Sequence, residues 1–195
     1  MLRHLACRSR TDSVPPVLIF LRIVGVFNAA IWLGSAMFFT FGVAPAIFSD
    51  EMKQVFAAPG NPLREYYLGV IAQHLIGRYF TLNLVCCLIA IGHFFAEMIY
   101  AGKPFRRFTF GLLVGILALG LLAGYVFAPK IKELHRLKYR GTAQEQTVAT
   151  PQLSRLHGVS MTGNLIGLIA LVIYTWQVTN PSDHMRFVSA QKFRG

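Results

Sequence analysis

The sequence predicts an all-α integral membrane protein, a bundle of four transmembrane helices arranged as two tandem hairpins. Hydrophobic residues make up 54% of the 195 residues and charged residues 14%, with a mean hydropathy of +0.51. A soluble domain has about a quarter of its residues charged. Four apolar runs reach the roughly 20 residues that a helix needs to cross the hydrocarbon. Helices are expected in all four, because an open strand edge in lipid leaves backbone groups without hydrogen bonds.

The expected spans are about 17–44, 68–100, 107–128 and 151–178, in a membrane domain 17–179 between basic tails at 1–16 and 180–195. Pro45 and Pro129 lack an N–H and disfavour helix at the preceding alanine. The first and third helices are therefore expected to end or kink there and to bend into surface segments. Thr150 followed by Pro151 predicts the N-cap and first turn of the fourth helix.

The basic residues predict both a partner and an orientation. The net charge is +11, and the cations gather in loops between apolar runs, which favours anionic lipid headgroups over nucleic acid as the partner. The first apolar run is too long for a signal-peptide core, so it is expected to stay as a helix. The expected topology puts nearly equal numbers of lysine and arginine residues on the two sides of the membrane. The flank before the first helix is more basic than the loop after it, which favours cytoplasmic termini.

The two halves of the chain resemble each other. The first helix ends FGVAPAI and the third ends YVFAPKI, while TLNL (81–84) in the second helix matches TGNL (162–165) in the fourth. Helices one and three cross in the same direction, so the pattern predicts a parallel internal repeat of two diverged hairpins.

Tryptophan and glycine predict the packing of the bundle. Trp32 shares one helical stripe with Asn28, Ser35 and Phe39, which indicates a core position rather than an interfacial anchor. Small residues at four-residue spacing predict close helix approach. The glycine pairs are Gly111/Gly115, Gly120/Gly124 and Gly163/Gly167. Two such faces on the third helix predict two neighbours, or one neighbour and a second protomer.

Polar residues within the spans are the candidates for a site, because ionisable groups are costly in lipid. They are His74, Arg78 and Asn83 on the second helix, and His157 and Asn164 on the fourth. Three interpretations stay open at this point. The groups hydrogen-bond across the bundle or reach headgroups; they form a mouth for a small solute, lipid or metal in a transporter or resistance protein; or His74 and His157 ligate haem b or copper in a redox protein.

No enzyme motif is present: the sequence has no HExxH, P-loop or GxSxG, and only one acidic residue in any span. We therefore expect a non-enzymatic accessory or interaction subunit without a cofactor. It would act through lipid and helix–helix contacts, in a homo-oligomer or a larger membrane complex.

A family resemblance rests on IWLGSAMFFTFGVAPAIF, REYYLGV and LHGVSMTGNLIGL, across roughly 20–178. These segments resemble the bacterial domain-of-unknown-function 4149 family, which is similar to eukaryotic transmembrane protein 205. The resemblance implies a small four-helix protein of the bacterial inner membrane with no established activity, and it supplies no catalytic residues. The basic segment 130–140 and the C-terminal tail are expected to depart from the family pattern.

Overall fold

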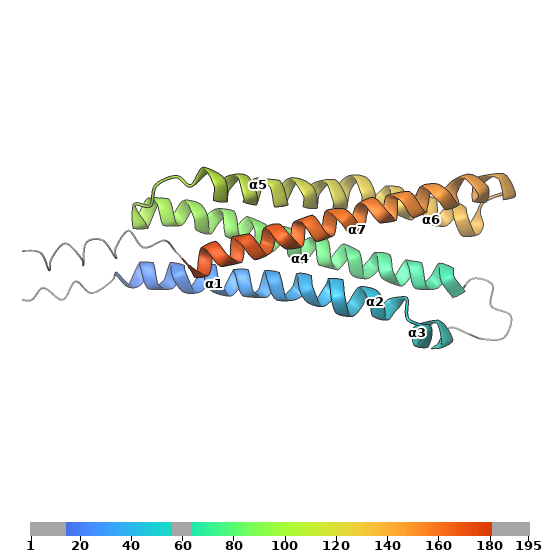
Figure 1. Ribbon diagram of the computed structural model, residues 1–195, viewed down its shortest axis with the longest axis horizontal. Helices are drawn as coiled ribbons and strands as arrows, with labels where there is room; N and C mark the ends of the chain where they lie inside the picture. Colours follow the sequence, from blue (N-terminus) through green and yellow to red (C-terminus); the bar gives the residue numbers. More distant parts are fainter. Residues whose placement is uncertain (1–14, 56–63, 181–195) are drawn as a thin grey trace, which may run out of the picture.

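Long helices lie side by side along one axis in the computed structural model, which describes residues 15–55 and 64–180 (Figure 1). Their bounds are α1 Pro16–Met37, η1 Phe38–Val43, α2 Ala44–Ile47, α3 Asp50–Val55, α4 Arg64–Ala101, α5 Arg107–Leu122, η2 Ala123–Phe127, α6 Ala128–Arg140 and α7 Ala143–Thr179. The segments join into four continuous helices that are long and apolar enough to cross a membrane. The all-α four-helix fold predicted from the sequence is confirmed.

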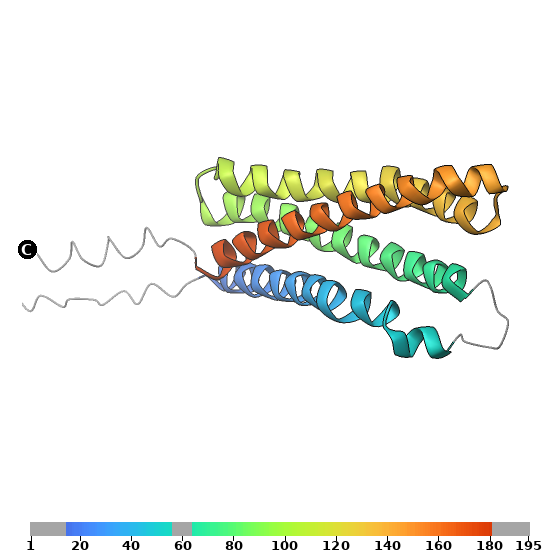
Figure 2. The same ribbon diagram turned by 45° about the vertical axis from the view of Figure 1, so that its right-hand side comes forward.

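The four long helices pack as a ring. α1 contacts α4 and α7, and α5 contacts the same two helices from the opposite side. The helical ends at Pro16 and Thr179 lie at the same end of the bundle, and the turn between α4 and α5 lies there too (Figures 1 and 2). The opposite end holds α3, the start of α4 and the connection between α6 and α7.

The two Ala-Pro elements differ in outcome: the helix ends at Ile47, two residues after Pro45 and close to the predicted end, whereas past Pro129 it continues to Arg140, so the predicted end there is wrong. A π-helical turn, η1 or η2, precedes each element, and the helix continues through the proline. The wider π turn changes the hydrogen-bond register where the proline has no N–H to give. Past Pro45 the helix runs only to Ile47, and the chain then turns into α3. Past Pro129 it runs on as α6, so the basic segment 130–140 prolongs α5 instead of bending onto the membrane surface.

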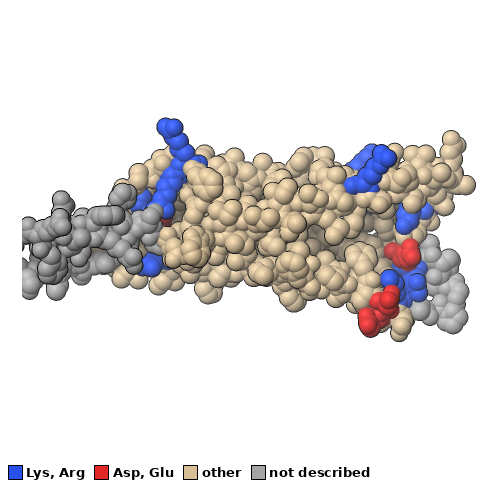
Figure 3. Space-filling view, viewed as in Figure 1, with Lys and Arg blue, Asp and Glu red and all other residues tan. Residues whose placement is uncertain are grey.

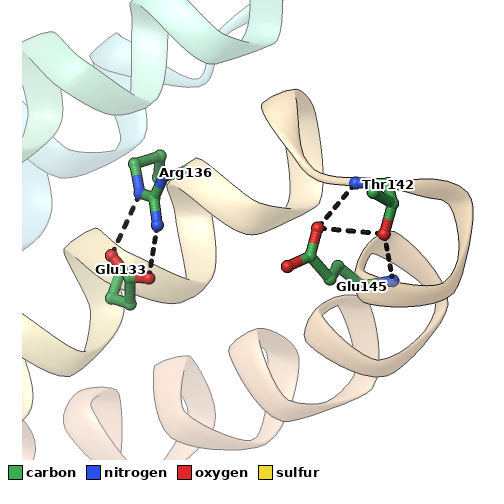
Figure 4. A network of polar contacts seen from close by, with 4 residues as sticks. All are labelled: Glu133, Arg136, Thr142 and Glu145. Carbon is green, nitrogen blue, oxygen red and sulfur yellow. Dashed lines mark hydrogen bonds and ion pairs between the residues drawn. The ribbon is translucent and has the colours of Figure 1, made fainter.

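The fourth long helix begins earlier than predicted. Its N-cap is Thr142, whose hydroxyl accepts from the backbone N–H of Glu145, while the Glu145 carboxylate accepts from the Thr142 backbone N–H over 2.7 Å (Figure 4). This reciprocal pair satisfies two donors at once. Thr150 is therefore not the N-cap, and Pro151 lies inside the helix. The sequence signal at Thr142 was available, because Thr-x-x-Glu is the usual capping-box pattern.

Charged pairs secure the polar ends of the bundle. On α6, Arg136 donates to Glu133 over 2.7 and 3.1 Å, one turn before the connection to α7 (Figure 4). On α3, Lys53 lies 2.7 Å from Asp50, and this hydrogen bond holds the pKa of the Asp50 carboxyl below its ordinary value. In the view of Figure 3, lysine, arginine and acidic side chains gather at the two ends and leave an uncharged waist. That distribution is the one expected of a bilayer-spanning body.

The core lies inside the ring. Its largest fully buried side chains are Trp32, Tyr174, Leu113 and Cys87, one from each long helix. The edge of the Trp32 ring meets the Tyr174 ring at a centroid distance of 5.8 Å. The core position predicted for Trp32 is confirmed, since its side chain is 0% exposed.

Candidate functional site

The asparagine of the TLNL segment anchors α4 to α1. The indole Nε1–H of Trp32 donates a short hydrogen bond to Oδ1 of Asn83. An indole can only donate, so the oxygen of the amide faces Trp32 and its Nδ2 group faces another way. Nδ2 points toward α5, where a Cβ placed on Gly120 would lie 3.2 Å from it. The hydrogen bond satisfies a buried donor that has no access to water.

The asparagine of the TGNL segment joins three helical segments. Nδ2 of Asn164 on α7 donates to Oγ1 of Thr40 in η1 over 2.9 Å. Its Oδ1 accepts from the hydroxyl of Tyr79 on α4 over 3.4 Å. The ring of Tyr79 is stacked on Phe39, with 4.4 Å between the centroids and an interplanar angle of 4°. Both polar atoms of this amide are therefore used inside the bundle.

The two asparagines take corresponding places in the two hairpins. Each lies beside a helix with a π-helical turn that ends two residues before the proline of Ala-Pro. When the helices are aligned on Pro45 and Pro129, Gly124 takes the place of Thr40. Asn164 thus has a hydroxyl where the corresponding asparagine has a glycine. Among the residues that the structure describes, none accepts a hydrogen bond from Nδ2 of Asn83.

A groove of about 210 Å³ lies at this place, between α4 and the continuous helix α5–η2–α6. Gly120 and Gly124 line one wall, and Gly77, Thr81 and Asn83 line the other. The Thr81 hydroxyl donates its proton to the carbonyl of Gly77 over 3.1 Å, and no hydrogen bond joins it to Asn83. Among the described residues that line the groove, the donors without a hydrogen bond are the Asn83 Nδ2 group and the hydroxyl of Tyr125, a residue that is 75% exposed.

The other predicted site residues lie outside this network. His74, Arg78 and His157 all have exposed side chains on the outer surface. Within residues 15–55 and 64–180, no hydrogen bond or ion pair joins the three, and no group of three His, Cys, Asp or Glu side chains gathers as a metal site. The structure separates them from Asn83 and Asn164, which belong to the interior. Ligation of haem b or copper by His74 and His157 stays a prediction.

The predicted glycine pairs differ in what surrounds them. A Cβ at Gly120 would press on the Asn83 amide, as close packing requires. A Cβ at any of the other five would meet nothing within 4 Å; these are Gly111, Gly115, Gly124, Gly163 and Gly167. Among residues 15–55 and 64–180, no other helix therefore approaches these five glycines closely. Contact with a second protomer or another membrane protein stays a prediction.

Two approaches closer than the one at Gly120 involve glycines that the sequence did not single out. The ring of His93 lies where a Cβ of Gly25 would be, and the ring of His135 lies where a Cβ of Gly69 would be. His93 Nε2 also lies 2.9 Å from the carbonyl oxygen of Leu21. Each pair brings an imidazole against the backbone of a neighbouring helix. A lone glycine and a histidine many residues apart give no signal at sequence level.

An aromatic cluster holds the start of α4 to α6. Tyr66 stacks on His135 with 5.3 Å between ring centroids, and the guanidinium of Arg140 lies 4.3 Å from the centre of the Tyr66 ring. The hydroxyl of Tyr139 donates to Glu65 over 2.8 Å. The segment expected on the membrane surface is thus tied to the end of the bundle by rings and a cation–π contact.

Comparison with known proteins places these features in a family. The chain matches the family described as Domain of unknown function (DUF4149) over residues 27–140, from the middle of α1 to the end of α6. The match includes the basic segment 130–140, so the expected departure from the family pattern there is wrong, while LHGVSMTGNLIGL lies beyond the matched residues. No curated protein and no solved structure matches the chain. Since the match spans more than half of the 195 residues, the chain belongs to the DUF4149 family.

Proposed function

We propose that this protein is a non-enzymatic accessory subunit of the bacterial inner membrane that acts through helix–helix and lipid contacts. The observation that carries the proposal is the open glycine face of α5. Gly111 and Gly115 are exposed, lie one helical turn apart, and have nothing within 4 Å of a Cβ placed on them. Small residues at this spacing are the usual means by which membrane helices approach closely.

Two interior hydrogen bonds support the same proposal, because they link helices of the bundle to one another. The hydrogen bond from Asn28 to the carbonyl of Cys86, 3.0 Å long, links α1 to α4. The Thr109 hydroxyl donates to Gln177 over 2.6 Å and links α5 to α7. With these groups engaged inside, the outward faces are the parts available to a partner. A second copy of the chain or another membrane protein that presents small residues fits the α5 face.

Lipid is the second partner. The long helices expose large side chains such as Phe20, Phe27 and Trp176 to the bilayer, and the cations at both ends of the bundle suit anionic headgroups. Both helical ends lie on one side of the bundle, and the basic flank before α1 supports placing that side in the cytoplasm.

Native mass spectrometry after extraction in native lipid discs tests the proposal. The wild type should carry a second copy or another membrane protein together with lipid. Gly115→Leu should lower the complexed fraction at least tenfold, because its side chain keeps the helices apart. Val114→Phe is the control: it adds volume to the neighbouring exposed position of α5, off the glycine face, and should keep the complex. A wild type found only as a bare monomer, or a Gly115→Leu complex at wild-type level, would reject the proposal.

A further inference from the structure

We infer that the groove beside Asn83 is a binding site for a membrane-dissolved apolar molecule that carries a ring carbonyl, the chemistry of a quinone. The inference rests on a difference between the two hairpins. The amide N–H of one asparagine donates to a side chain of the protein, whereas that of the other borders the groove and has no acceptor among the described residues.

Two side chains of the first hairpin have no counterpart at the groove in the second hairpin. In the α1–α7 contact, Asn164 donates to Thr40, and Ala36 lies one turn before Thr40. In the corresponding α5–α4 contact, glycines replace both residues of the odd helix: Gly124 stands for Thr40 and Gly120 for Ala36. The groove thus lies where the second hairpin lacks the side chains of Ala36 and Thr40. The missing groups include the hydroxyl that accepts from Asn164 in the α1–α7 contact.

The Nδ2 group of Asn83 determines which kind of ligand fits the groove, because it needs a hydrogen-bond acceptor. An N–H group in the hydrocarbon that finds no acceptor is costly, because lipid chains offer no hydrogen bond in place of the one that water gave it. The orientation of Asn83 is fixed by Trp32, so its Nδ2 cannot turn away from the groove to find another partner. A saturated acyl chain offers it nothing. A carbonyl oxygen placed in the groove takes the position that the Thr40 hydroxyl has in the other hairpin.

The depth and the volume of the groove suit a molecule with a six-membered ring. Along α4 the groove runs from Gly77 to Cys87, about 15 Å at the helical rise, which is about half of the hydrocarbon thickness. Asn83 lies near the middle of α4 (Arg64–Ala101), a helix long enough to span the membrane, so it is deeper than the ester carbonyls at the surface of a phospholipid layer. The volume of about 210 Å³ exceeds the roughly 150 Å³ cavity that holds benzene in an engineered protein. An apolar tail can leave between the helices into the lipid.

Gly124→Thr tests the inference directly, because it rebuilds the arrangement of the first hairpin. Nothing lies within 4 Å of a Cβ at Gly124, so the side chain has room, and its hydroxyl can accept from Asn83. Gly92→Thr on α4 is the matched control, since its Cβ also meets nothing and it does not line the groove. Melting temperatures establish that both variants fold, and Gly124→Ser carries the same hydroxyl if threonine proves too large.

Binding is measured in phosphatidylcholine nanodiscs with a decyl-tailed 1,4-benzoquinone as the probe and tryptophan fluorescence as the signal. All variants carry Trp176→Phe, because Trp176 is 70% exposed and would be quenched by quinone dissolved in lipid. Quenching of Trp32 should saturate, its apparent affinity should fall at least tenfold in Gly124→Thr, and Gly92→Thr should match the parent protein.

Three results would overturn the inference. Quenching that rises linearly with quinone in every variant means only partition into the lipid. Equal affinity in the parent protein and Gly124→Thr means that the quinone binds elsewhere. Quenching of Trp32 by phosphatidylcholine with brominated chains that falls in Gly124→Thr, together with no saturable quenching by the quinone, assigns the groove to an acyl chain. None of these results bears on the α5 glycine face, so the proposed function and this site stand or fall separately.

Discussion

Trp32 of α1 and Asn83 of α4 share a hydrogen bond inside the bundle, at the wall where a groove meets the core. The bond does two things. It satisfies the buried indole, and it fixes which end of the amide faces the groove. The contact between α1 and α4 and the proposed quinone site therefore depend on the same pair.

A double-mutant cycle should detect the coupling between this pair. Asn83→Leu leaves the buried indole N–H without an acceptor, and Trp32→Phe removes that donor. Interhelical hydrogen bonds in membrane proteins average about 0.6 kcal/mol and reach about 1.7. We expect a coupling of about 1 kcal/mol in the free energy of unfolding, measured by titration with SDS from mild detergent. Strictly additive single effects would show that the hydrogen bond contributes nothing.

Loss of the Thr40 hydroxyl should loosen α7 from α1. Thr40→Val keeps the shape of the side chain but leaves Nδ2 of Asn164 without its acceptor, so unfolding should become easier by about 1 kcal/mol. Thr162→Val is the control, because that hydroxyl bonds only to Gly158 of its own helix. The same SDS titration compares the two variants. Equal stabilities would mean that the contact between α1 and α7 does not depend on this bond.

The glycine that faces His93 should tolerate no side chain. Gly25→Ala places a methyl group in the imidazole ring, and overpacking of this kind costs about 1–3 kcal/mol. Gly34→Ala, on the same helix, meets nothing within 4 Å and should be neutral or stabilising by up to about 1 kcal/mol through helix propensity. Thermal unfolding of the two variants separates them. A Gly25→Ala protein as stable as Gly34→Ala would contradict the close contact between α1 and α4.

The start of α7 should depend on its capping box. Thr142→Ala removes the hydroxyl that accepts from Glu145, and such a loss costs about 1 kcal/mol. Hydrogen exchange should become faster in the first turn of α7, and Thr142→Ser should restore protection. Thr147→Ala removes a hydroxyl that bonds only to the Ala143 carbonyl, so it should leave the cap intact. Unchanged exchange in Thr142→Ala would place the true start of the helix elsewhere.

The fold could be predicted from the sequence because membrane helices follow from length and hydropathy. The ends of helices were harder. Pro45 and Pro129 both signal a break. The helix ends two residues after Pro45, near the predicted end, but past Pro129 it continues to Arg140, and no residue pattern predicts the π-helical turn before either proline. The predicted start of the fourth helix at Thr150 and Pro151 was wrong for a similar reason. A proline inside a helix cannot be distinguished by sequence from a proline in the first turn.

The candidate site was predicted only in part. Asn83 and Asn164 stood out because the repeat aligned them, and both proved to be interior hydrogen-bonding residues. His74 and His157 stood out because ionisable groups are costly in lipid, yet both lie exposed on the surface. Helical periodicity places residues on one face of a helix but does not say whether that face looks inward. The groove was not predicted, because it depends on which side chains are absent from one hairpin.

Labelling of single cysteines in intact cells tests the four-crossing arrangement most directly. Lys103→Cys lies in the turn between α4 and α5, and Arg140→Cys lies at the end of α6. Both are made with Cys7, Cys86 and Cys87 replaced by alanine. A membrane-impermeant thiol reagent should label Arg140→Cys in intact cells, and Lys103→Cys only after the membrane is opened. Labelling of both positions from the same side would contradict the topology and, with it, the correspondence between the two hairpins.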